Sequence, residues 1–279
     1  MGRGWRGGLA ALGTLCLVLA PTLAGCAAAP APPDGVTASL VQQRSDVADR
    51  VAEVRVHNGS DAAFAFAGVR VEDTRFAASA DIEGEVRLAA GETVDLRFAL
   101  PDVVCAPGLK LRRTLVFELA GGGELASDLT TADDFTLGLH ERECLLAEVS
   151  RTAELAWTAF APSPPGEPAH ATLTVTPTGG GDPVLLAGIQ STNLLQFAPK
   201  GGDRWGLDLA LDAASAAVEV DVPLVPQRCD PHVVQEDKRG TIFTIEVEEP
   251  RAGTIELPMP PELKARVLTW VAEWCRFGQ

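Results

Sequence analysis

Two stretches of the sequence decide the fold: AGETVDLRFALPDVVC at residues 90–105 and DAASAAVEVDVPLVPQRC at residues 212–229. Each begins with a small polar turn, continues with alternating apolar and polar residues, and reaches a proline and a short loop that ends in cysteine. Alternation with a period of two is typical of a strand with one buried face. The two stretches therefore predict equivalent strands in two copies of one domain.

The match between the two halves of the chain extends upstream. AGV at residues 67–69 corresponds to AGI at residues 187–189, and Phe76 and Phe197 follow at similar distances. The order of features is kept although few identities remain. We therefore interpret the chain as a diverged duplication.

Short strands separated by turn signals recur about every ten residues in both halves, as in an antiparallel sandwich. VAEVRVHNGS at residues 51–60 alternates and then reaches Asn58-Gly59, a dipeptide typical of hairpin turns. Asn58 also begins a glycosylation sequon, which we interpret as a turn. We expect a mainly β protein with two tandem immunoglobulin-like antiparallel β-sandwich domains, at residues 36–150 and 151–279, each with a short helix near its C-terminal end.

The two expected helices lie at equivalent places. PPELKARVLTWVAEWC at residues 260–275 places apolar residues at helical spacing on one face; they are Leu263, Val267, Trp270, Val271 and Trp274. DDFTLGLHEREC at residues 133–144 is less regular, because Gly138 lies inside it and its apolar residues also fit alternation. We expect the last helix to pack on the second sandwich rather than to present Trp270, Trp274 and Phe277 to a partner.

The first residues have the three zones of an export signal. A start with Arg3 and Arg6 precedes an uncharged apolar run at residues 9–20, which is shorter than the roughly 20 residues that span a membrane. The sequence LAGC at residues 23–26 resembles the lipobox of bacterial lipoproteins. This resemblance implies that residues 1–25 are removed as a signal peptide and that Cys26 carries the lipid. The alternative is a plain secretory signal cut near residues 27–29.

Residues 26–35 are rich in alanine and proline and predict an extended tether. At roughly 3.1 Å per residue, such a tether would hold the folded body roughly 25–30 Å above the lipid. We expect the protein at the cell membrane, lipid-anchored on the extracytoplasmic face. The membrane is then one partner, and an envelope protein is a second candidate.

Charge excludes one class of partner. The chain has a formal net charge of −15, and loss of Arg3 and Arg6 with the signal leaves −17. We expect so acidic a body to be repelled by DNA, RNA and anionic lipid headgroups. The body of the sequence resembles uncharacterised secreted proteins of GC-rich Gram-positive bacteria, a resemblance that implies no activity.

Four cysteines remain after processing, and an even number in an exported protein predicts disulfides. The repeat pairs them within each domain, as Cys105–Cys144 and Cys229–Cys275. The alternative, a zinc site that uses cysteines with His140 or His232, lacks the close Cys-x-x-Cys pairs that zinc favours. We expect neither a metal nor a cofactor.

One loop is more polar and chemically varied than any other. It is RCDPHVVQEDKRG at residues 228–240, and its candidate ligand-binding residues are Asp230, His232, Glu236, Asp237, Lys238 and Arg239. The same composition also suits a charged connection between two strands.

Catalytic motifs are missing from the sequence, which contains neither Gly-x-Ser-x-Gly nor Ser-x-x-Lys. HEREC at residues 140–144 has cysteine where a zinc protease has its second histidine. We therefore expect a non-catalytic envelope lipoprotein that acts as a protein-binding or structural spacer module. The alternative is a small-ligand or cell-wall glycan binding protein, with Trp157 and Trp205 as candidate platforms, and an enzyme ranks third.

Overall fold

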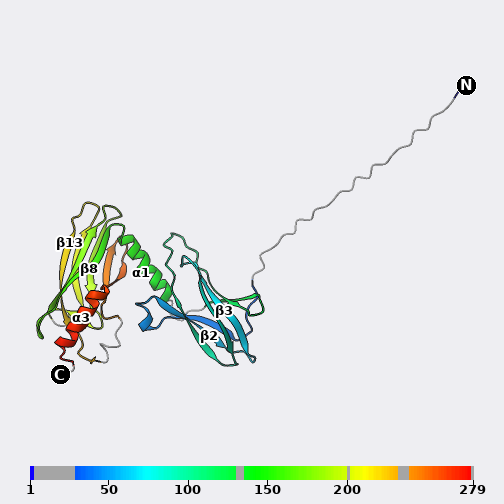
Figure 1. Ribbon diagram of the computed structural model, residues 1–279. Helices are drawn as coiled ribbons and strands as arrows, with labels where there is room; N and C mark the ends of the chain where they lie inside the picture. The colour runs from blue at the N-terminus through cyan, green and yellow to red at the C-terminus, as the bar shows by residue number, and fades with distance from the viewer. Residues whose placement is uncertain (3–28, 130–134, 200–201, 232–238, 278–279) are drawn as a thin grey trace.

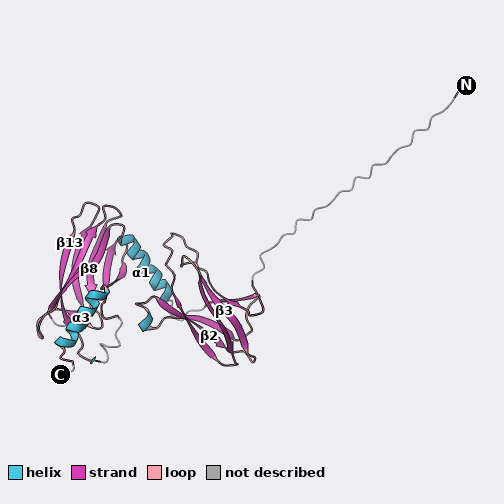
Figure 2. Cartoon of the chain, viewed as in Figure 1, coloured by secondary structure: helices cyan, strands magenta, loops and turns pink. Residues whose placement is uncertain are grey.

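The computed structural model describes residues 1–2, 29–129, 135–199, 202–231 and 239–277. Two β-sandwiches follow one another along the chain, and helix α1 (Phe135–Val149) lies between them (Figure 1). Strands dominate both bodies, and a second helix, α3 (Pro261–Trp274), lies on the second sandwich (Figure 2). The expected fold class, mainly β with immunoglobulin-like sandwiches, is confirmed.

The first domain packs two antiparallel sheets face to face, with strand orders β1-β2-β5 and β4-β3-β6-β7. Phe64, Phe66 and Phe117 lie between the sheets, with ring centroids 5.2 to 5.6 Å apart, a spacing at which aromatic rings attract one another. The strands are β1 (Val36–Val41), β2 (Val51–Asn58), β3 (Phe64–Asp73), β4 (Ala80–Leu88), β5 (Thr93–Ala99), β6 (Arg113–Glu118) and β7 (Glu124–Asp128).

The second domain has sheets of order β11-β13-β9-β8 and β12-β10-β14-β15. Its core includes Trp157, whose ring lies 4.7 Å from that of Phe243 and whose indole N–H donates to the Leu257 carbonyl. The strands are β8 (Ala153–Ala161), β9 (Ala169–Pro177), β10 (Val184–Gln190), β11 (Leu195–Phe197), β12 (Arg204–Leu211), β13 (Val218–Pro226), β14 (Ile242–Glu249) and β15 (Gly253–Pro258).

Strand order repeats between the two domains. β8, β9 and β13 neighbour one another as β1, β2 and β5 do, and β12-β10-β14-β15 repeats β4-β3-β6-β7. Irregularities repeat as well: a bulge breaks the register of β3 before Gly68 and of β10 before Gly188. Phe76 bridges to Val103 just after β5, and Phe197 pairs with the end of β13. The residues matched between the two halves of the sequence thus occupy equivalent positions.

Helix α3 packs on the second sandwich, as the sequence predicts. Leu263, Val267, Trp270 and Val271 are buried in the second core, and the Trp270 ring meets that of Phe160 at 5.5 Å. Pro261 begins the helix, where its missing N–H costs no hydrogen bond. The alternative of an exposed tryptophan face on this helix is wrong for Trp270, which is fully buried.

Asn58-Gly59 does not form the expected hairpin. β2 and β3, which flank it, pair with other strands and lie in different sheets. The Asn58 side chain is buried and donates to the carbonyl oxygens of Ala62, Leu88 and Ala89. Asparagine is therefore used here for its side-chain hydrogen bonds, which satisfy backbone groups where the chain crosses between sheets.

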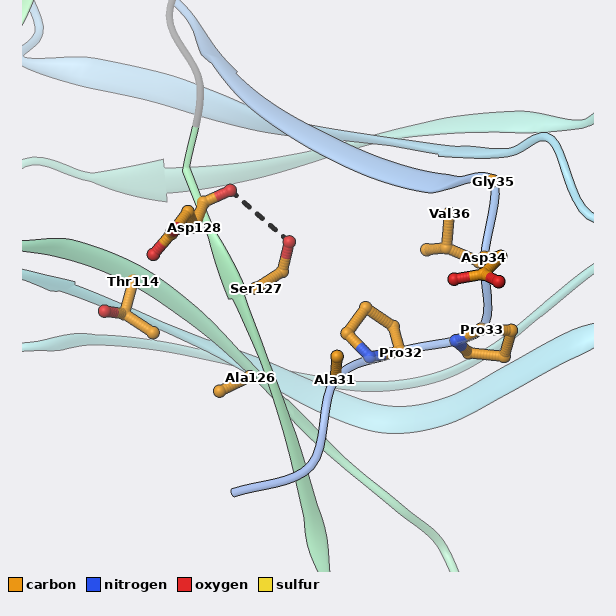
Figure 3. Close-up of a pocket in the computed structure, with 10 residues that line it drawn as sticks. All are labelled: Ala31, Pro32, Pro33, Asp34, Gly35, Val36, Thr114, Ala126, Ser127 and Asp128. Carbon is orange, nitrogen blue, oxygen red and sulfur yellow. Dashed lines mark hydrogen bonds between the residues drawn. The ribbon is translucent and has the colours of Figure 1, made fainter. Parts of the chain in front are cut away.

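Part of the expected tether lies on the first domain. Residues 31–36 run beside β7, near Ala126 and Ser127 (Figure 3). The Ala126 N–H donates to the Pro30 carbonyl at 2.8 Å, so this segment covers part of the otherwise open edge of β7. Gly35 has a φ of +89° and lies so close to Gly59 that a side chain would collide with its carbonyl. Residues 27–29 then lie between Cys26 and the packed segment, so Cys26 and Pro30 are at most about 14 Å apart.

Candidate functional site at the domain junction

Helix α1 belongs to both hydrophobic cores. Phe135 and Leu139, in its first half, pack in the core of the first domain, and Leu145 and Val149, in its second half, lie in the core of the second. The sequence predicts a short helix that ends near residue 144, at the end of the first domain. The helix instead continues to Val149, because its last turns bury apolar residues against the second sandwich.

Buried polar contacts hold the first half of α1 to the first domain. Arg75 and Asp73 form an ion pair at 2.6 Å with almost no exposure to solvent, and the Arg75 guanidinium also donates to the Thr136 hydroxyl on α1. A buried charge pair needs such additional partners, since its desolvation is costly. One turn further, the His140 ring Nε2 lies 2.9 Å from the Val104 carbonyl oxygen and donates to it. His140 is thus engaged in a structural contact.

The second half of α1 lies against β15 and the turn before it. A Cβ atom at Gly253 would come within 2.8 Å of Leu145 Cδ2, so the leucine lies directly on the strand backbone. Arg251 binds Glu148 at 3.0 Å and donates to the Glu141 carbonyl at 3.1 Å. The helix therefore covers β15, one of the edge strands of the second domain, which an isolated sandwich would leave open.

The disulfides pair as the duplication predicts. Cys105, after β5, is joined to Cys144 on α1 with Cα atoms 5.4 Å apart. Cys229, after β13, is joined to Cys275 at the end of α3 with Cα atoms 5.2 Å apart. Both distances lie in the ordinary range for disulfides. In the part of the chain that the structure describes, no group of three or more metal-binding side chains comes together.

A groove lies between the domains beside α1. One side is the segment from the short 3-10 helix η1 (Arg44–Asp46) to Arg50, and the other is formed by residues 191–193 and by β14 with the residues just before it. It consists of two adjoining hollows of about 420 and about 190 Å³, which share Val47 and Ile242. The groove is thus built from residues far apart in the sequence.

Local hydrogen bonds fix the wall that the second domain contributes. The Thr192 hydroxyl accepts from the N–H groups of Leu194 and Leu195 and donates to the Gly240 carbonyl at 2.8 Å. This contact ties the turn after β10 to the residue that follows Arg239. Ser191, Asn193 and Arg239 consequently line one hollow.

Of the described residues of the polar loop after Cys229, Arg239 lies at this groove. Arg239 lines it and binds the Glu256 carboxylate at 2.6 Å, while Asp230 is exposed beside the second disulfide. The other residues of that prediction, His232, Glu236, Asp237 and Lys238, lie outside the described residues, as does Cys26. No local sequence pattern brings Arg44, Ser191 and Asn193 together, so the sequence alone does not predict them at this groove.

The candidate glycan platforms differ in exposure. Trp157 is buried in the second core and cannot stack on a sugar from outside. Trp205, on β12, is partly buried with its ring centroid 6.2 Å from that of Phe197. Among the described residues, no helix has the length and apolar character needed to cross a membrane.

No family model and no curated protein sequence matches the chain. Among solved structures it is similar to red sea bream transglutaminase, at 11% identity and a TM-score of 0.25 over 82% of this chain and 32% of that one. It is also similar to the calcium binding domain CBD12 of CALX1.1, at 12% identity and a TM-score of 0.21 over 78% and 79% of the two chains. A third is the Amycolatopsis orientalis exo-chitosanase CsxA, at 14% identity and a TM-score of 0.22 over 74% and 25%. The chain thus spans about a third or less of both enzymes.

Proposed function

We propose that this protein is a membrane-anchored, non-catalytic envelope lipoprotein whose two sandwiches act together as a protein-binding or structural spacer module. The anchor is the lipid on Cys26, and the location is the extracytoplasmic face of the cell membrane. The observation that carries the spacer role is the membership of α1 in both cores. A spacer needs a fixed length and direction, and a shared helix supports both.

Bending at the junction between the domains would cost free energy. Domains joined by a linker usually move relative to each other. Here a change of angle would withdraw Leu145 and Val149 from the second core or break the contacts of Arg75 and Cys144 with the first domain. Exposure of the two aliphatic side chains alone would cost about 3–6 kcal/mol. Bent forms are therefore rare at equilibrium.

The packed tether supports the same function. Because the Pro30 carbonyl is hydrogen-bonded to β7, the first domain would lie within about 14 Å of the lipid rather than at the end of a long extended tether. The first domain would then lie near the membrane, and its rigid connection to the second domain would fix the distance and direction of the second domain from the membrane.

The test is a measurement of the distance between the domains in the full-length chain in detergent. Spin labels on exposed positions, Leu111 of the first domain and Ala214 of the second, report this distance by pulsed electron spin resonance. A single narrow distribution is expected for the unaltered junction, and a broader one for the Leu145→Ala variant. A broad distribution in both proteins would contradict the spacer role.

A further inference from the structure

The groove between the domains carries an excess of positive charge. Among the described residues, its walls contain four arginines and two glutamates, namely Arg44, Arg50, Arg142, Arg239, Glu143 and Glu256. The described part of the groove thus has two net positive charges, although the whole chain has a net charge of −15. A cleft lined by one sign of charge raises the local concentration of ligands of the opposite sign.

The pairing of these charges leaves the larger hollow positive. Arg50 binds Glu143 in the smaller hollow. Glu256 is shared by two arginines, since Arg239 lies at 2.6 Å and Arg142 at 3.7 Å from the same oxygen. Arg44 is exposed and makes no ion pair with any other described residue. Its guanidinium can therefore bind an anion without giving up an ion pair to another described residue.

Uncharged donors line the same hollow. The Ser191 hydroxyl and the Asn193 side-chain amide make no side-chain hydrogen bond to other described residues, whereas Thr192 between them is fully engaged in the turn. Serine, asparagine and arginine are the donors that hold oxyanions, and arginine can donate two parallel hydrogen bonds to one anion. The hollow of about 420 Å³ has the size of a small-molecule site at a domain interface.

We propose that the groove binds a small phosphate monoester, with Arg44 of the first domain and Ser191 and Asn193 of the second as donors to its phosphate, and Arg239 adding positive potential. A phosphate monoester carries a charge of about −1.5 to −2 at neutral pH, close to the opposite of the groove. It also offers more acceptor oxygens than a carboxylate. The ligand would contact both domains and so stabilise their mutual position.

This site goes beyond the spacer role, which requires no ligand. Isothermal titration of the full-length protein in detergent with glucose 1-phosphate tests it, with acetate as the carboxylate comparison. Arg44→Gln is expected to weaken binding about tenfold or more, because a charged hydrogen bond is worth about 1.5–3 kcal/mol. Asn193→Ala is expected to weaken it less. The matched control is Arg55→Gln, which removes an exposed arginine paired with Asp95 outside the groove.

A second titration distinguishes a soluble phosphate monoester from a phosphate on a lipid headgroup. Vesicles of phosphatidic acid in phosphatidylcholine present the same group on a lipid, and the Cys26→Ala chain without its signal peptide is used so that no anchor binds the vesicle. Binding of either probe that Arg44→Gln weakens and Arg55→Gln does not supports the site and identifies its source. The proposal is overturned if neither probe binds saturably, if the two arginine variants behave alike, or if acetate binds as tightly. None of these results would alter the spacer role, which is measured by the interdomain distance.

Discussion

Leu139 and Leu145 are less than two turns apart on helix α1, and they are buried in the cores of different domains. A helix with residues in two cores cannot rotate with one domain without removing side chains from the other. If one sandwich unfolds, α1 loses the packing that this sandwich provides. The other sandwich then loses part of the support for the helix that completes its own core. The two domains should consequently unfold together.

The first prediction concerns this cooperativity. Leu145→Ala is expected to lower the free energy of unfolding of the second domain by about 2–5 kcal/mol, through lost burial and the cavity left behind. It should also separate the unfolding of the two domains. Tryptophan fluorescence follows the second domain, because all four tryptophans after residue 25 lie there, and far-ultraviolet circular dichroism follows both domains.

The matched control for this measurement is Leu111→Ala. Leu111 is 56% exposed, so its removal should change the unfolding free energy by about 0.5 kcal/mol or less. Coincident fluorescence and dichroism curves are expected for the control and for the unaltered protein, and separate curves for Leu145→Ala. Coincident curves in all three proteins would show that α1 does not couple the domains.

The second prediction concerns the disulfide between Cys105 and Cys144. Replacement of both cysteines by serine should destabilise the protein by about 4 kcal/mol on the chain-entropy model, for a separation of 39 residues. Denaturant titration measures the loss, and nonreducing peptide mapping of the unaltered protein checks the pairing. Recovery of Cys105 linked to Cys229 would contradict the arrangement of two separate domains.

The third prediction concerns anchoring. With Cys26→Ala, the sulfur that would carry the lipid is absent, so the protein should leave the membrane fraction or keep its signal peptide. Cell fractionation followed by intact-mass analysis distinguishes these results. Cys16→Ala, within the leader, is the control and should remain anchored. Membrane association that still requires detergent in a Cys26→Ala protein whose signal peptide has been removed would refute the lipobox interpretation.

The fourth prediction concerns acid. Gln190 and Arg204 hydrogen-bond the Glu246 carboxylate and hold its pKa below the ordinary value of 4.5. Since the pKa of Glu246 is lower in the folded than in the unfolded chain, these contacts stabilise the protein above about pH 4.5 and lose their effect as pH falls through the folded pKa.

Thermal unfolding between about pH 6 and about pH 3 measures this effect. Glu246→Gln should lower the melting temperature at the upper pH and should flatten its decline toward the lower pH. The comparison protein is Glu154→Gln, because Glu154 is exposed and its carboxylate makes no hydrogen bond with another described residue. If the melting temperature falls equally steeply with pH in both variants, Glu246 does not contribute to the acid sensitivity of the protein.

The sequence by itself determined the repeated sandwich, the pairing of the four cysteines and the position of α3. These features rest on alternation of period two, helical spacing and the order of residues within each half, which are short-range patterns that follow from backbone geometry. AGV and AGI correspond in the sequence, and in the structure the glycine of each, Gly68 or Gly188, follows a bulge in its strand.

Only the tertiary structure decided how the two halves meet. The last turns of α1 are helical because their apolar residues are buried against β15. The Asn58 side chain hydrogen-bonds backbone carbonyls where the chain crosses between two sheets, and the Pro30 carbonyl accepts a hydrogen bond from β7. Arg44 and Arg239 are about 200 residues apart and line one groove because two sandwiches pack beside one helix. Local sequence patterns specify strands and helices, but contacts between distant residues arise from packing, which no short stretch of the chain encodes.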